Sequence, residues 1–197
     1  MNLPNKLTVS RLALTAAFLA VIFSPRVQLR ETVALVLFSV ASLTDYFDGK
    51  IARQRKLITN FGILMDPLAD KILVCSAFIA FVGLNWMPAW MVVIIVAREL
   101  AITGLRLLAA SKNLVLAAER YGKHKTISQI VAIIAILVQH SYNDWGRVGW
   151  AVFGFPAFGM PWVDRFAPLA IWVSVVLTFV SGALYLWRNR QLYLDDL

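Results

Sequence analysis

The sequence predicts an all-α, polytopic membrane protein with six transmembrane helices in a single domain covering residues 1–197. Hydrophobic residues make up 60% of the chain and charged residues only 15%, and the mean hydropathy of +0.72 lies outside the range typical of soluble domains. The apolar residues gather in runs that approach the roughly 20 residues a helix needs to cross a bilayer. Basic residues cluster between those runs, as membrane topology requires.

Six helical spans are expected at residues 6–24, 33–54, 63–84, 88–111, 125–143 and 166–188. The first follows Pro4, and Asn5 or Thr8 is suited to cap it because a short polar side chain accepts a hydrogen bond from a free backbone N–H. The third and fourth spans share one uncharged run, which a turn at 83–88 divides into a helical hairpin.

Residues 141–165 do not fit a regular span, because glycines and prolines interrupt a largely aromatic and apolar stretch. We expect an interfacial or partly re-entrant loop there. A seventh short span is the alternative, and it would place the C-terminal residues on the opposite side of the membrane.

The net charge of +8 does not indicate nucleic-acid binding, since the basic residues do not line one soluble face. Of the 19 Lys and Arg residues, only Arg26, Arg30, Arg147 and Arg165 fall toward one side of the six predicted spans. The positive-inside rule then places both termini in the cytoplasm. We therefore expect a multi-pass protein of the cytoplasmic (inner) membrane, surrounded by the lipid bilayer, with the cavity formed by residues 45–70 on the cytoplasmic side.

Four aspartates, Asp45, Asp48, Asp66 and Asp70, lie in segments apolar enough to be inside a membrane. An ionised carboxylate at that depth costs about 2.5–3.5 kcal/mol on insertion scales, so such residues usually face a polar cavity and serve function. Spacings of three and four residues put each pair on one helix face, and two antiparallel helices can bring those faces together. Oxygen ligands without His or Cys favour Mg²⁺ or Mn²⁺, and a pair of such cations suits phosphoryl chemistry.

The same residues allow a purely structural interpretation. Asp66-Pro67 resembles a helix N-cap followed by proline at the first helical position, and Asp48-Gly49 resembles a turn. Either pair alone leaves both interpretations open, whereas four carboxylates together favour a cation site.

The spacing itself carries a resemblance. Asp45-x-x-Asp48-Gly49-x-x-Ala52-Arg53 is followed after eight residues by Gly62, then by Asp66 and Asp70 at intervals of four. This pattern resembles the signature of the CDP-alcohol phosphotransferase family. The resemblance implies a six-helix membrane enzyme that binds two divalent cations, Mg²⁺ or Mn²⁺, and displaces CMP from a CDP-linked substrate with an acceptor alcohol.

The resemblance also implies roles for the residues that match the signature. Asp45, Asp48 and Asp66 would be the principal metal ligands, while Asp70 would complete the metal site and act as general base on the acceptor hydroxyl. CDP binding would fall to Asp48, Gly49, Ala52, Arg53 and Gly62, since small residues let the backbone approach a ligand closely. For Arg53, a positive-inside anchor remains the alternative.

The acceptor must be inferred from other charges. Arg98, Ile102 and Arg106 follow an i, i+4 row, so both arginines can face one cavity, and Lys123 and Lys125 enter the next span. Such a cationic pocket suits an acceptor that carries its own phosphate. We assign acceptor phosphate binding to Arg11, Arg98, Arg106, Lys123 and Lys125, although the positive-inside bias alone accounts equally well for the two lysines.

Residues 2–11, 66–71, 97–106 and 122–126 further resemble bacterial members of the family that use CDP-diacylglycerol and glycerol 3-phosphate. The expected products are phosphatidylglycerol phosphate and CMP. A cardiolipin synthase, or another family member with a different acceptor, is the main alternative. A divalent-cation transporter is a remote one, because the spans are nearly all apolar beyond the aspartates. Small and aromatic residues on several spans are compatible with a homodimer.

Overall fold

The structure is a computed structural model that describes the backbone of residues 3–55, 60–112, 114, 116, 121–157 and 159–194. Within these ranges it describes all side chains except those of residues 3, 4, 7, 45–55, 60–64, 66, 121–123, 157 and 194. The elements in chain order are α1 (Leu3–Ile22), α2 (Arg30–Arg55), α3 (Asn60–Gly83), α4 (Ala89–Ser111), α5 (Tyr121–Ser141), η1 (Tyr142–Trp145), α6 (Gly146–Phe153), β1 (Pro156–Ala157), β2 (Met160–Pro161), α7 (Trp162–Arg188) and α8 (Gln191–Leu194).

Six long helices dominate the described chain, and each overlaps one of the six predicted spans. Five of the six begin three or four residues before the predicted span, because they start in largely polar sequence that hydropathy does not mark, and the C-terminal ends agree within two residues. The expected cap of the first helix is wrong: α1 begins at Leu3, so Asn5 and Thr8 lie inside it. The turn at 83–88 is confirmed, and Asn85 takes a positive φ of 60° there.

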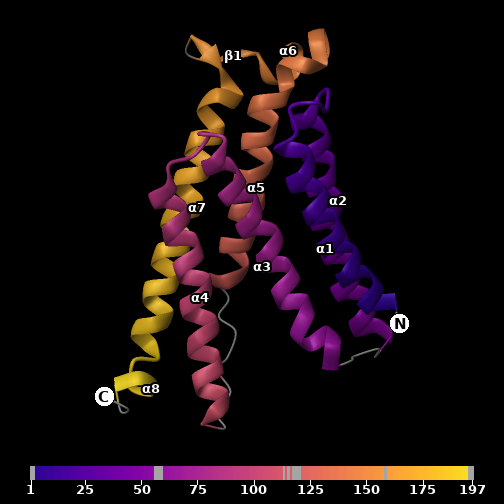
Figure 1. The fold of residues 1–197 in the computed structure, drawn as a ribbon. Helices are drawn as coiled ribbons and strands as arrows, with labels where there is room; N and C mark the ends of the chain where they lie inside the picture. The colour runs from indigo at the N-terminus through magenta and orange to yellow at the C-terminus, as the bar shows by residue number, and fades with distance from the viewer. Residues whose placement is uncertain are drawn as a thin grey trace.

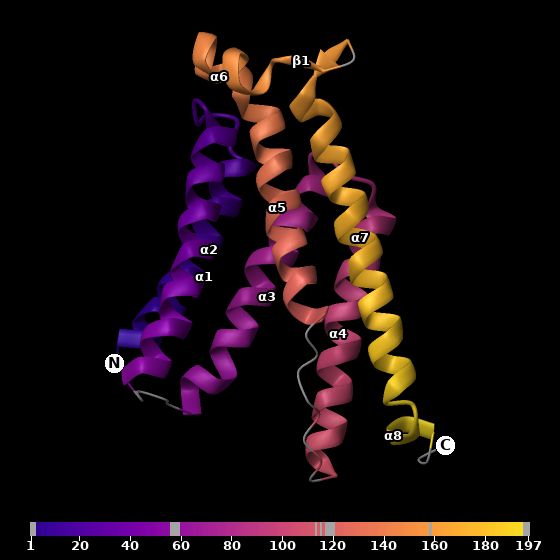
Figure 2. The ribbon, with the colours of Figure 1, turned by 180° about the vertical axis from the view of Figure 1, so that it is seen from behind.

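The long helices run up and down, so the chain returns repeatedly to the same two ends (Figure 1). The start of α1, the end of α2, the start of α3, the end of α4 and α8 lie toward the lower end, whereas α6 and the strands lie at the upper end (Figures 1 and 2). α1 packs on α2 and α3, and α5 packs on α2 and α7, while α4 lies against α7.

The main hydrophobic core draws buried residues from all six long helices. Phe18 of α1 and Phe38 of α2 are fully buried and their ring centroids lie 6.1 Å apart. Phe78 and Phe81 extend the core along α3. Close packing of these rings helps to hold the helices together, since the many weak dispersion contacts of a buried side chain add up.

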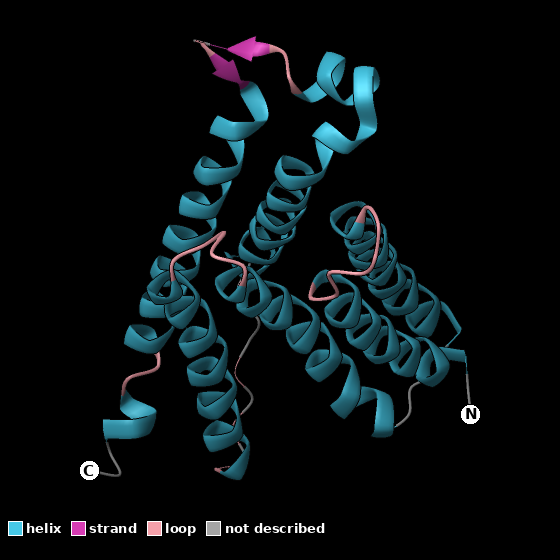
Figure 3. Cartoon of the chain, turned by 45° about the horizontal axis from the view of Figure 1, so that its top comes forward, coloured by secondary structure: helices cyan, strands magenta, loops and turns pink. Residues whose placement is uncertain are grey.

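The segment at 141–165 forms a cap of short elements on the upper end (Figure 3). The indole N–H of Trp145 donates to the Thr32 hydroxyl at 2.9 Å, which ties the cap to α2. β1 and β2 form a minimal antiparallel hairpin with Ala157 opposite Met160. The alternative of a seventh span is wrong, because α6 has only eight residues and covers about 12 Å.

Large apolar side chains are exposed on the outer faces of the helices. Leu100 and Leu107 on α4 are each 68% exposed, and Phe179 on α7 is 60% exposed. By length and composition, α7 is the one helix in the described part of the chain that could cross a bilayer, and Thr8–Ile22 is a shorter apolar helix. The six-helix prediction is thus confirmed for the helices, and their passage through a membrane stays a prediction.

Candidate active site

The four signature aspartates lie on two helices that meet the lower end. Asp45 and Asp48 belong to the last part of α2, while Asp66 and Asp70 belong to the first half of α3. Both helices are continuous through these positions, so the turn at Asp48-Gly49 and the helix cap at Asp66 are wrong. The helical backbone therefore gives each pair the shared face that the spacing predicts.

Several residues predicted to bind the metal or CDP have side chains that the structure does not describe. These are the side chains of Asp45, Asp48, Asp66, Ala52 and Arg53. Gly49 and Gly62 lie in α2 and α3, and their surroundings are likewise not described. The metal and CDP assignments for these residues stay predictions. Among the described side chains, no group of three His, Cys, Asp or Glu residues is close enough to hold a metal ion.

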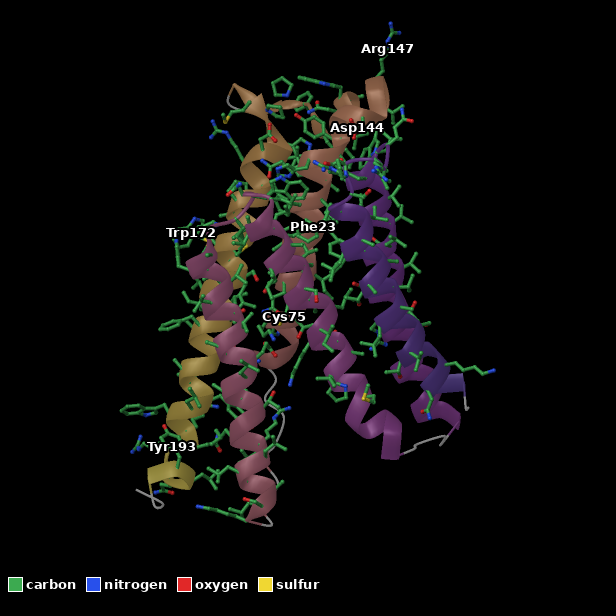
Figure 4. All side chains as sticks on the ribbon, in the orientation of Figure 1. Phe23, Cys75, Asp144, Arg147, Trp172 and Tyr193 are labelled. Carbon is green, nitrogen blue, oxygen red and sulfur yellow. The ribbon has the colours of Figure 1, made fainter. Side chains whose placement is uncertain are left out.

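Asp70 is the signature aspartate whose side chain is described, and it is half-buried. It lines a small cavity between α3, α4 and α5 together with Lys71, Glu99, Lys125 and others. Cys75 lines the same cavity and lies well inside the bundle, far from Asp144 and Arg147 at the upper end (Figure 4). The cavity has room for about one water molecule.

Glu99 joins two of the predicted acceptor-binding cations. Its Oε1 accepts a hydrogen bond from Arg98 NH1 at 3.1 Å and another from Lys125 Nζ. The three side chains are only 14% (Arg98), 10% (Glu99) and 7% (Lys125) exposed. We call Arg98, Glu99 and Lys125 the Glu99 cluster. Sequence reasoning did not assign Glu99 a role, although an acidic residue in the middle of an apolar helix is a signal for one.

Thr103 connects the Glu99 cluster to the helix that carries Asp70. Lys71, the residue after Asp70 on α3, donates to the Thr103 hydroxyl. Thr103 in turn donates to the backbone carbonyl of Glu99 at 2.7 Å. The polar contacts of α3, α4 and α5 are therefore continuous from Lys71 to Lys125.

The remaining predicted acceptor residues do not join this cluster. Arg106 is exposed; its Nε lies 3.5 Å from the Tyr185 hydroxyl and its guanidinium lies 5.8 Å from the ring centroid. Arg98 and Arg106 thus both reach toward α7, as their spacing predicts. Arg11 is fully buried in α1, and the side chain of Lys123 lies outside the described set.

Arg98 also lines an apolar groove. A cavity of about 340 Å³ lies between α4 and α7, lined by Val93, Ala97, Phe179 and Ala183 among other residues. Arg98 is the one charged residue among those that line it in the described chain. The stem of Arg98 passes Gly182 so closely that a Cβ built there would lie 2.6 Å from Arg98 Cγ. Glycine at 182 is therefore what lets Arg98 reach Glu99 along this path.

Comparison with known proteins places the chain among transferases. Residues 1–180 match the sequence model of CDP-alcohol phosphatidyltransferases, so the chain belongs to the CDP-alcohol phosphatidyltransferase family. It is 40% identical, over 96% of both chains, to the CDP-diacylglycerol–glycerol-3-phosphate 3-phosphatidyltransferase of Bacillus subtilis. The Rickettsia typhi protein of the same name is 30% identical, over 93% of this chain and 94% of its own.

A third relative matches over a shorter part of the chain. The probable phosphatidylglycerophosphate synthase of Mycobacterium tuberculosis is 42% identical over 67% of this chain and 64% of its own. These findings confirm the family resemblance that the aspartate signature predicts.

The fit of Arg98 against α7 gives the first testable prediction. Gly182→Ala should destabilise the protein by about 1–3 kcal/mol, because the added methyl group overpacks the contact with Arg98 Cγ. The measurement is thermal unfolding of the protein purified in detergent.

Gly104→Ala is the matched control. Gly104 also lies in a long helix, but a Cβ there meets nothing within 4 Å. The control should leave stability unchanged or raise it by up to about 1 kcal/mol through helix propensity. Equal shifts in the two variants would exclude the contact with Arg98 as the cause.

Proposed function

We propose that this protein transfers the phosphatidyl group of CDP-diacylglycerol to glycerol 3-phosphate, giving phosphatidylglycerol phosphate and CMP. The observation that carries the proposal is the 40% identity, over nearly the full length of both chains, to a relative named for this reaction. The buried cations of the Glu99 cluster support it, because an acceptor that carries a phosphate needs positive charge at its binding site.

The proposal includes a location in the cell membrane. Six helices of 20 to 27 residues are each at least about 30 Å long, which matches the hydrocarbon core in length, and α7 also has the apolar composition of a membrane span. Their exposed leucines and phenylalanines form the kind of surface that lipid, and not water, would cover. With the positive-inside rule, the lower end and both termini face the cytoplasm, where water-soluble glycerol 3-phosphate is available. A homodimer is compatible with this arrangement.

The proposed metal site consists of two divalent cations, Mg²⁺ or Mn²⁺, held by Asp45, Asp48, Asp66 and Asp70. The residues fit such a site in two respects: they offer only hard oxygen donors, and each pair lies on an uninterrupted helix that meets the lower end. Bound cations would supply positive charge that stabilises the phosphate oxygens while CMP leaves. Gly49, Ala52, Arg53 and Gly62 would contact the CDP moiety.

The acceptor hydroxyl must lose its proton as it attacks the β-phosphorus, the one that carries the diacylglycerol. We propose that the carboxylate of Asp70, which lines the same cavity as Lys125, accepts this proton. The new bond joins the acceptor oxygen to the phosphorus, and the bond from that phosphorus to the bridging oxygen of CMP breaks. Arg98 and Lys125 bind the phosphate that glycerol 3-phosphate brings with it and so orient the hydroxyl toward Asp70.

The acceptor is tested directly. Purified protein in detergent with CDP-diacylglycerol should release CMP when glycerol 3-phosphate is added, but not with phosphatidylglycerol, inositol or serine. Product extraction should give phosphatidylglycerol phosphate in equal amount to CMP. Release with phosphatidylglycerol alone would identify a cardiolipin synthase and overturn the proposal.

The role of Asp70 is tested by Asp70→Asn. Loss of a general base should lower turnover by about 10²- to 10⁴-fold, whereas binding of CDP-diacylglycerol in the presence of Mg²⁺ should remain. Asp144→Asn is the control, since Asp144 is exposed at the upper end and should tolerate the change (Figure 4). Turnover of Asp70→Asn near that of the wild type would remove Asp70 as the base.

Metal dependence is tested by removal and return. Chelation with EDTA followed by buffer exchange should abolish CMP release, and excess Mg²⁺ or Mn²⁺ should restore it. Full turnover in rigorously chelated protein would contradict a metal site at the aspartates.

A further inference from the structure

An acidic side chain beside a proposed phosphate site requires an explanation. Glu99 is 8% exposed and lies within hydrogen-bond distance of two cations that the proposed function assigns to the acceptor phosphate. A carboxylate repels a phosphate, so on charge alone Glu99 should weaken acceptor binding. Its burial among the cations points to a different contribution.

The contacts show what Glu99 does for the two cations. Arg98 comes from α4 and Lys125 from α5, and both donate to the same oxygen, Oε1 of Glu99. Without that oxygen, two buried like charges would repel each other and move apart. Glu99 therefore sets the distance between the cations and leaves the cluster with one surplus positive charge.

The cluster keeps donors that an anion can use. Within the described part of the chain, Nε of Arg98 is buried and has no hydrogen-bond partner. Buried donors of this kind are rare in folded proteins, since a buried polar group without a partner is unfavourable. A phosphate oxygen beside Arg98 would satisfy this donor, and the surplus charge would favour the anion's entry.

Two neighbours hold the cluster in place from outside. Gly182 of α7 leaves room for the stem of Arg98, and the Thr103 hydroxyl is bonded to the Glu99 carbonyl. The side chain of Arg98 is thus confined between α4 and α7 while its end is held by Glu99. Because the Arg98 side chain is already confined, it loses less conformational entropy when a ligand binds.

We propose that Glu99 is a positioning residue for the acceptor: its carboxylate holds Arg98 and Lys125 together so that their remaining donors bind the acceptor phosphate. The inference rests on the proposed function, because it names the residue that organises the acceptor site. Glu99 contacts the two cations and not the reacting atoms.

The test is Glu99→Gln, assayed by CMP release with each substrate varied in turn. The Michaelis constant for glycerol 3-phosphate should rise by about tenfold or more, while that for CDP-diacylglycerol changes by less than about twofold. The turnover number at saturating acceptor should stay within about threefold of the wild type, because the base is intact. If repulsion between Glu99 and the phosphate dominated, the constant for the acceptor would fall, and the proposal would be wrong.

A second variant covers the case in which Glu99→Gln does not fold. Glu99→Asp keeps the charge but shortens the side chain by one methylene, so it cannot reach both cations equally well. The Michaelis constant for glycerol 3-phosphate should rise by about threefold or more. An unchanged constant in a folded Glu99→Asp protein would overturn the proposal.

Thr32→Val is the matched control for a general loosening of the bundle. It removes another polar contact between elements, the 2.9 Å hydrogen bond from Trp145 Nε1 to the Thr32 hydroxyl at the upper end, away from the Asp70 cavity. Its unfolding temperature should fall, but its Michaelis constant for glycerol 3-phosphate should not change. An equal rise in both variants would reduce Glu99 to a structural role.

The wild-type protein separates failure of this inference from failure of the proposed function. Wild-type turnover with glycerol 3-phosphate, together with an unchanged acceptor constant in Glu99→Gln, defeats only the inference. Absence of wild-type turnover with this acceptor defeats the proposed function.

Discussion

The structure depends on how charged side chains are neutralised inside an apolar helical bundle. Packing of apolar side chains brings helices together but does not fix their register, because dispersion contacts have no direction. Contacts from a charged or hydroxyl group do fix it. Lys71 to Thr103 links α3 to α4, and Glu99 to Lys125 links α4 to α5. Arg98 against Gly182 aligns α4 with α7. The polar contacts that lower the cost of buried charge therefore also determine how these four helices sit against one another.

The same contacts bring the proposed general base close to residues of the proposed phosphate site. Asp70 and Lys71 are consecutive on α3, and Asp70 shares its small cavity with Glu99 and Lys125. The proposed base and Lys125 thus approach from different helices and line one cavity, while Arg98 is bonded to Glu99 and lines the groove between α4 and α7. An acceptor whose phosphate binds at one end of this region would present its hydroxyl at the other. The helix register set by the Glu99 cluster is then also what aligns the substrate.

Much of the fold could be predicted from the sequence, because an apolar run of about 20 residues has few alternatives to a helix. Local turn signals were less informative. Asp48-Gly49 and Asp66-Pro67 both resemble breaks, yet both lie inside helices, since tertiary packing overrides a weak local preference. The cap at 141–165 was not predictable in detail. It is held by contacts such as Trp145 with Thr32, which are 113 positions apart in the chain.

The candidate site shows the same difference between local patterns, which the sequence reveals, and contacts between distant residues, which it does not. The aspartates were found because their spacing is local, with all four within 26 positions and two helices. The partners of Arg98 are not local: Gly182 lies on another helix, and Lys125 reaches Glu99 from a third. Spacing alone treats Arg98 and Arg106 as equivalent, because both lie on one row of α4. Only Arg98 has an adjacent acid and a glycine opposite it, whereas Arg106 packs on Tyr185. The environment of each arginine, and not its place in the pattern, is therefore the reason for proposing Arg98 and not Arg106 as a binder of the acceptor phosphate.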